Sequence, residues 1–173
     1  MRIIAGRWRG RRLVAPDGRE VRPTLDRVRE AWMSIVNPLL PDARVLDLFA
    51  GSGALGLEAL SRGAASADLV ESAVHSLRAI AANIAALDAD DVVRVHSADA
   101  VAFAHALTSH AYDVAFADPP YEAGLSQLVA QRWLDTPFAD VLGVEHRWFE
   151  KMPGEGEVRR YGDSAITFYR VQS

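Results

Sequence analysis

Short apolar runs alternate with longer segments of helical periodicity along most of this chain of 173 residues. Apolar runs bounded by turn residues are typical of buried strands, whereas apolar residues that recur every three or four positions are typical of amphipathic helices. Strands alternating with helices predict an α/β fold with a mainly parallel sheet and right-handed crossovers. The predicted strands are residues 44–49, 67–71, 92–96, 112–117, 141–149 and 164–171, and the predicted helices are residues 54–62, 73–87, 99–107 and 124–134.

Both ends of the chain depart from this alternation. Residues 2–5 and 12–15 are expected to pair as a short β-hairpin, and Thr24 is expected to cap a helix that ends before Pro38. Near the C-terminus no helical pattern precedes residues 164–171, which are rich in Ile, Thr, Phe and Tyr. This composition predicts a terminal hairpin whose last strand runs antiparallel to the others.

The composition fits one domain with one core. Half of the residues are hydrophobic and 24% are charged, which is typical of a globular chain. The chain has no cysteine and its five histidines lack metal-ligand spacing, so neither disulfides nor a metal site is expected. No charge-free apolar run approaches the roughly 18 residues of a membrane span, and the N-terminal residues lack the apolar core typical of a signal peptide. We therefore expect a soluble, cytoplasmic monomer without membrane contact.

Positive charge is concentrated at the N-terminus, although the net charge of the chain is −4. Residues 1–30 hold nine arginines and four acidic residues, and the densest segment contains Arg7, Trp8, Arg9, Arg11 and Arg12. Basic residues around an aromatic side chain are typical of nucleic-acid-binding segments. A GC-rich genome would explain arginine in place of lysine, but not its concentration here. We expect residues 1–23 to form a basic arm that contacts RNA, ahead of a larger domain at residues 24–173.

Three of the five other arginines before the first core strand extend this set of candidates. Arg22, Arg27 and Arg29 are candidates for the same RNA-binding surface. Arg27 and Arg29 are equally well spaced to pair with Asp26 or Glu30 as ordinary ion pairs on a helix.

A glycine turn follows the first core strand. Gly51, Gly53 and Gly56 have the spacing of a nucleotide-binding turn, and Glu71 ends the next predicted strand. A nicotinamide cofactor would place its pyrophosphate over this turn, where the carboxylate of Asp47 would repel it. S-adenosylmethionine (SAM) instead carries an ammonium and a sulfonium there, which a carboxylate attracts. The pattern favours SAM, with Glu71 on the ribose hydroxyls; a plain strand-to-helix turn is the structural alternative.

A second apolar strand ends abruptly in Asp118, Pro119, Pro120 and Tyr121. Two prolines cannot continue a parallel ladder, so the Asp118 side chain and the Pro119 carbonyl are expected to face one small volume. Two acceptors that bind the N–H groups of an exocyclic amine would free its lone pair for attack on a methyl group. Tyr121 is expected to stack on the base. A rigid loop with Asp118 as a turn residue is the alternative.

Taken together, the two motifs predict methyl transfer from SAM to a planar nitrogen. Asp99 follows the third predicted strand and is expected either to bind the adenine amino group of SAM or to cap the next helix. Two other classes of function stay open. A dinucleotide-binding dehydrogenase would leave the segment from Asp118 to Tyr121 unexplained, and an RNA-binding module without catalysis would not need Asp47 or Glu71.

Six segments also match the pattern of a known family: Met1–Leu13, Arg22–Glu30, Asp47–Leu60, Asp118–Tyr121, Val144–His146 and Tyr161–Tyr169. They resemble the RsmD family, whose members are bacterial 16S rRNA guanine-N2 methyltransferases. The resemblance extends over nearly the whole chain. The chain departs from the family at Ala73, where an acidic residue is common, and at Ala5 and Arg7, where glycine and lysine are common.

The resemblance implies a class I methyltransferase fold, which is Rossmann-like with a seven-stranded sheet and an antiparallel last strand. It implies SAM as methyl donor and, as acceptor, the N2 amine of a loop guanine in 16S rRNA within an assembled or assembling small ribosomal subunit. By that match, Asp47, Gly51, Gly53, Glu71 and Asp99 belong to the cofactor site, and Asp118, Pro119, Pro120 and Tyr121 to the catalytic site. Adenine N6, cytosine N4 and protein glutamine methyltransferases share the second motif, so only the N-terminal segments select guanine in rRNA.

Overall fold

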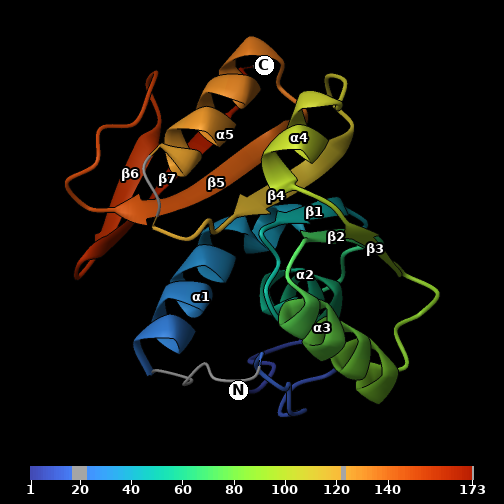
Figure 1. The fold of residues 1–173 in the computed structure, drawn as a ribbon. Helices are drawn as coiled ribbons and strands as arrows, with labels where there is room; N and C mark the ends of the chain where they lie inside the picture. The colour runs from blue at the N-terminus through green and yellow to red at the C-terminus, as the bar shows by residue number, and fades with distance from the viewer. Residues whose placement is uncertain (17–22, 122–123, 173) are drawn as a thin grey trace.

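A seven-stranded sheet forms the centre of the molecule (Figure 1). This computed structural model describes residues 1–16, 23–121 and 124–172. The strands are β1 (Arg44–Leu48), β2 (Ser66–Glu71), β3 (Val93–Ser97), β4 (Tyr112–Ala117), β5 (Ala139–Arg147), β6 (Glu157–Tyr161) and β7 (Ser164–Arg170). Their order in the sheet is β3-β2-β1-β4-β5-β7-β6. Strands β1 to β5 run parallel, and β7 runs antiparallel to both of its neighbours. The predicted α/β fold with an antiparallel last strand is confirmed.

Helices cover both faces of this sheet. They are α1 (Pro23–Val36), followed by the 3₁₀ turn η1 (Asn37–Leu39), α2 (Ala54–Ser61), α3 (Val74–Leu87), α4 (Ala100–His105) and α5 (Leu125–Asp135). Figure 1 shows α1, α2 and α3 on one face and α4 and α5 on the other. Among the described residues, none of the helices is both long and apolar enough to span a membrane.

Successive residues of the central strands supply two separate cores, because side chains alternate between the faces of a strand. Val45 belongs to the core that includes Trp32 of α1, whereas its neighbour Leu46 belongs to the core that includes Trp133 of α5. The edge of the Trp32 ring meets the Phe116 ring, with centroids 5.6 Å apart. Burial on both faces explains the continuous apolar runs of β1 and β4.

The N-terminal segment differs from the predicted β-hairpin. Arg2 and Arg12 form a single antiparallel bridge instead of two paired strands. The backbone N–H groups of Ile4 and Ala5 donate to the carboxylate of Glu58 on α2, at 2.8 and 3.1 Å. Because these donors are bound to a helix, they cannot continue a β ladder, and the segment follows the helical layer.

Two other elements also differ from the sequence-based prediction. Helix α1 begins at Pro23, so Thr24 lies within the first turn rather than at the cap. Proline is favoured at the first helical position because its missing N–H would have no partner there. Strand β6 (Glu157–Tyr161) lacks the apolar alternation of a half-buried strand, since it is exposed and charged at the edge of the sheet. Charged edge strands resist unwanted pairing with other chains.

Candidate active site

A cavity lies at the carboxyl ends of β1, β4 and β5, where parallel α/β sheets bind ligands. Asp47 and Gly51 line it from β1 and the turn that follows, and Asp118 lines it from the end of β4. Helix α1 contributes the opposite wall through Arg29 and Trp32. The structure thus brings together residues that lie far apart in the sequence.

The glycine turn permits a close approach between backbone and carboxylate. Gly53 adopts φ +82° as the N-cap of α2. A Cβ atom at Gly56 would lie 2.4 Å from Cδ2 of Leu69 and 3.4 Å from Oδ2 of Asp47. A side chain at this position would therefore displace its neighbours. Phe49, which also lines the cavity, has φ +59°, a left-handed conformation that is rare for an aromatic residue and typical of functional sites.

Asp47 presents an unsatisfied acceptor in this cavity. Its side chain is buried, and Oδ2 accepts a hydrogen bond of 3.0 Å from the backbone N–H of Gly56. Oδ1 is buried without a hydrogen-bond partner. Burial raises the pKa of Asp47 well above its ordinary value, and the nearby carboxylates of Asp118 and Glu71 act in the same direction. A cationic ligand group would provide the missing partner and restore the ionised form.

Glu71 holds the turn in place from the end of β2. Its Oε1 accepts a hydrogen bond of 2.8 Å from the N–H of Gly51, and its Oε2 accepts 2.9 Å bonds from the N–H groups of Ser72 and Ala73. Although Glu71 does not line the cavity itself, it fixes Gly51, which does.

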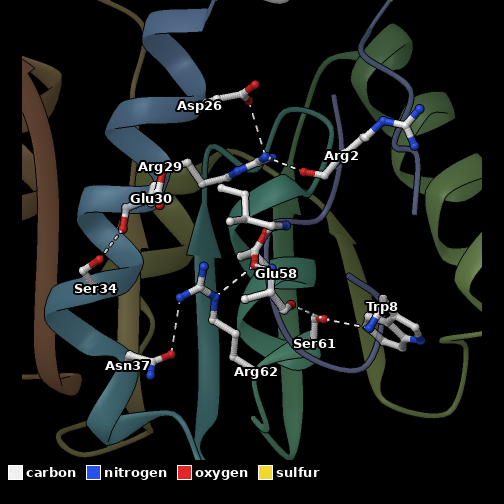
Figure 2. Close-up of polar contacts among 12 residues, drawn as sticks. Arg2, Trp8, Asp26, Arg29, Glu30, Ser34, Asn37, Glu58, Ser61 and Arg62 are labelled. Carbon is white, nitrogen blue, oxygen red and sulfur yellow. Dashed lines mark hydrogen bonds and ion pairs between the residues drawn. The ribbon is translucent and has the colours of Figure 1, made fainter. Parts of the chain in front are cut away.

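Arg29 is buried rather than exposed, and of its two expected roles the described contacts support the ion pair with Asp26. Figure 2 shows its guanidinium between α1 and the N-terminal segment. Nη2 donates to the carbonyl of Arg2 at 2.6 Å and lies 3.4 Å from Oδ1 of Asp26. Nε and Nη1 are buried without partners, and burial lowers the pKa of Arg29. Because Arg29 lines the cavity, an anionic ligand group bound there would provide acceptors for its Nε and Nη1 donors.

The Asp118–Tyr121 segment begins where β4 stops. The backbone N–H of Asp118 makes a last, long bond of 3.4 Å to the carbonyl of Leu48, and Pro119 is buried behind it. The side chain of Asp118 is exposed at the cavity. Tyr121 is 49% exposed, and its hydroxyl lies 2.6 Å from Oγ of Ser164. The Asp118 carboxyl group, an acceptor, and the Tyr121 ring are therefore both exposed within this segment of four residues.

Glu145 is a second carboxyl in the cavity that the sequence analysis did not single out. The parallel register pairs Ala117 of β4 with Val144 of β5. Asp118 and Glu145 are the next residues on these adjacent strands and therefore lie beside each other. Glu145 is buried, and burial together with a hydrogen bond to Asp118 raises its pKa. The raised pKa favours the protonated form of Glu145, which donates this hydrogen bond to the carboxyl group of Asp118. An acidic residue in the apolar run of β5 was the available signal.

Asp99 serves as the N-cap of α4. Its Oδ1 accepts a hydrogen bond of 2.8 Å from the N–H of Ala102, and the residue is exposed. It does not line the cavity. Of the two roles expected for Asp99, the described contacts support the helix cap.

The basic arm packs on α2 and α3. The backbone N–H of Trp8 donates to Oγ of Ser61 at 3.0 Å (Figure 2). The Trp8 ring is half-buried, and Cζ of the Arg7 guanidinium lies 4.2 Å from the ring centroid. The N–H of Val14 donates to Oδ1 of Asn83 on α3 at 2.7 Å. The side chains of Arg7, Arg9, Arg11 and Arg12 are exposed, as is that of Arg27, whereas Arg22 lies outside the described residues.

Comparison with known proteins places the chain in a family. The family described as "Conserved hypothetical protein 95" matches residues 1–170. Ribosomal RNA small subunit methyltransferase D of Escherichia coli K12 is 48% identical over 126 residues, which are 72% of this chain and 62% of that protein. The chain belongs to the RsmD family. The match spans less than two thirds of the E. coli RsmD protein.

Solved structures agree with this membership in the RsmD family. The structure of yhhF from Escherichia coli superposes with a TM-score of 0.83 at 38% identity, covering 98% of this chain and 97% of that one. The 16S rRNA N2 G1207 methyltransferase RsmC of T. thermophilus, in complex with AdoMet and guanosine, superposes with a TM-score of 0.68 at 18% identity. It covers 91% of this chain and 45% of that one. The chain therefore has the class I methyltransferase fold.

Proposed function

We propose that this RsmD-family protein transfers a methyl group from SAM to the N2 amine of a guanine in 16S rRNA. The observation that carries the proposal is one cavity lined both by Asp47, whose Oδ1 has no hydrogen-bond partner, and by the carboxyl pair of Asp118 and Glu145. The E. coli relative is named as a methyltransferase of small-subunit rRNA, and the RsmC structure contains guanosine, which support the same acceptor.

The residues present fit the amino-acid end of SAM. Free Oδ1 of Asp47 matches an ammonium, and the free Nε and Nη1 of Arg29 match a carboxylate. Both residues line the same cavity and are buried, so each lacks the solvent that would otherwise satisfy it. Glu71 would meet the ribose hydroxyls beside the turn it fixes. A dinucleotide is disfavoured, because its pyrophosphate would meet the carboxylate of Asp47.

The chemistry assigned to the Asp118–Tyr121 segment is orientation and electrostatic stabilisation. SAM supplies an electrophilic methyl group when bound. The Asp118 carboxylate and the Pro119 carbonyl accept hydrogen bonds from the two N–H groups of the amine, which directs its lone pair toward that methyl group. Tyr121 stacks on the base, and Glu145 orients the carboxyl group of Asp118 through the hydrogen bond between them.

An unpaired guanine suits a site that must reach an exocyclic amine. The amine of a base in a duplex is inaccessible, and a base in a loop is the least costly to extrude. We propose that residues 1–23 act as an RNA-contacting arm and residues 24–173 as the methyltransferase domain. We also propose a monomer that acts in the cytoplasm on an assembled or assembling small subunit, during ribosome biogenesis.

Incubation of the protein with methyl-labelled SAM and either naked 16S rRNA or small subunits from an unmodified strain tests this function. We expect label in the RNA of at least one substrate and none in ribosomal protein. Absence of label from both RNAs, with tight binding of reduced nicotinamide cofactor, would instead favour a dehydrogenase-like protein. Label confined to protein would indicate a protein glutamine acceptor.

A further inference from the structure

Exposed aromatic and basic side chains gather where β5 ends. We call Tyr121, Arg147, Trp148, Phe149 and Arg160 the aromatic rim. The exposed fractions of Tyr121, Trp148 and Phe149 are 49%, 46% and 62%. Large aromatic side chains with half of their surface in water are unusual for a folded protein unless they serve an interaction.

Arginine side chains cover two of these rings. Cζ of Arg147 lies 4.8 Å from the ring centroid of Tyr121, and Cζ of Arg160 lies 4.0 Å from that of Trp148. The Trp148 ring in turn meets Phe149 edge to face, with centroids 5.8 Å apart. Within the described part of the chain, neither arginine forms an ion pair, unlike Arg44 with Asp113. Their charge therefore stays available to an anionic partner.

The rim adjoins the candidate active site through backbone register and one hydrogen bond. Arg147 of β5 pairs with Ser164 of β7, and Oγ of Ser164 lies 2.6 Å from the hydroxyl of Tyr121. The N–H of Trp148 donates to the carbonyl of Asp163, just before β7, at 3.0 Å. The end of β5, the start of β7 and the segment after β4 are distant in the sequence and thus meet at Tyr121, which is three residues after Asp118 in the chain.

We propose that the aromatic rim binds single-stranded RNA next to the base that enters the cavity. Exposed rings stack on bases whatever their sequence, and unpaired arginines contact the phosphates between them. A protein partner would not require free cations stacked on aromatic rings, and duplex RNA would not offer base faces. This inference rests on the proposed function, because it assigns the path of the same RNA substrate.

A set of matched variants tests the rim. The double variant Trp148→Ala/Phe149→Ala removes the rings, Arg147→Ala/Arg160→Ala removes the charges, and Trp148→Phe keeps a ring. Arg94→Ala and Val95→Ala are the controls, because these exposed residues lie on β3 at the opposite edge of the sheet. The probes are a labelled single-stranded RNA of mixed sequence and the corresponding duplex, each titrated at low and moderate salt, with SAM affinity measured alongside.

We expect the loss of both rings to weaken single-strand binding by about tenfold to a hundredfold, with the salt dependence and the duplex affinity nearly unchanged. Loss of both arginines should reduce the slope of log affinity against log salt by about one to two. Trp148→Phe should retain most of the affinity, and both controls should match the wild type, as should all SAM affinities.

Wild-type single-strand affinity in the variant without rings would overturn the inference, and so would an equal loss for duplex and single strand. The outcome is separable from the proposed function. A wild-type protein that binds RNA through the rim but transfers no methyl group contradicts only the function. A rim variant that binds and methylates normally contradicts only the rim.

Discussion

The basic arm and the aromatic rim both combine arginine with tryptophan, yet they differ in burial and in what they contact. In the arm, Trp8 is half-buried and its backbone is tied to Ser61 of α2. In the rim, Trp148 is exposed. The preceding residue, Arg147, pairs with Ser164, which is hydrogen-bonded to Tyr121 of the Asp118–Tyr121 segment. The arm is fixed to the helices beside β1 and β2, whereas the rim follows β5 toward the β6 edge.

This difference separates two tasks that both require positive charge. Phosphate contacts position a nucleic acid and depend mainly on charge, while contacts to bases require free aromatic faces near the chemistry. The arm, in which Arg7, Arg9, Arg11 and Arg12 are exposed, suits the first task. The carboxyl ends of β4 and β5, in the interior of the sheet, suit the second, because the carboxyl pair lies there beside the rim.

The largest expected effect lies at the carboxyl end of β4. Replacing Asp118 with alanine should lower kcat by about 10² to 10³, because its hydrogen bond to the amine strengthens in the transition state. Affinities for SAM and RNA should stay near the wild-type values. Steady-state methylation of small subunits provides the measurement, and Asp113→Ala, at the amino end of the same strand, is the control. Near-normal turnover in the Asp118 variant would make the motif structural.

A smaller effect is expected in the arm. Replacing Arg7, Arg9, Arg11 and Arg12 with alanine should weaken RNA binding by about tenfold to a hundredfold at moderate salt and flatten its salt dependence. The SAM affinity should not change, because these side chains lie outside the cavity. Titration at two salt concentrations, with Arg78→Ala on α3 as a single-charge control, measures both quantities. An unchanged slope would assign phosphate binding to the rim alone.

The smallest effect concerns stability and comes from Glu145. Its pKa is raised in the folded protein, so folding retains a proton that the unfolded chain releases. The contribution of Glu145 to the free energy of unfolding is therefore complete below pH 4.5, the ordinary pKa of this group. It falls as the pH rises toward the raised pKa of the folded state. Glu145→Gln cannot ionise, so its Tm should exceed that of the wild type by about 3 °C or more at pH 8.

At pH 4 the two Tm values should agree, because both side chains are then neutral in both states. Turnover should survive in Glu145→Gln, since the amide can donate to Asp118, and Glu145→Ala should lose turnover. Thermal unfolding across this pH range is the measurement. Equal Tm values at pH 8 would show that Glu145 is ionised beside Asp118.

The sheet and its order of elements were predictable from the sequence because local periodicity and glycine positions determine them. The spacing of Gly53 and Gly56 predicted the turn between β1 and α2. The apolar run at residues 112–117 predicted the strand that ends at Asp118. Exposed β6 gave no such signal, since its burial pattern has no alternation.

Tertiary contacts set the limits of the prediction at the site. The spacing of Arg29 from Asp26 indicated an ion pair but not burial against the carbonyl of Arg2, which depends on how the arm folds over α1. Glu145 becomes a partner of Asp118 only through strand register, and the rim assembles from three distant segments. An acidic residue in the apolar run of β5 marks Glu145 as unusual, but the local sequence identifies neither its partner nor the segments that form the rim.

The most direct test of the account is the identity of the methylated nucleoside. Small subunits from an unmodified strain are incubated with labelled SAM and either the wild-type protein or Asp118→Ala, and the RNA is digested to nucleosides. We predict that the label from the wild type appears as N2-methylguanosine at one position and that the variant yields almost none. Label in N6-methyladenosine or N4-methylcytidine, or equal labelling by the variant, would contradict the account.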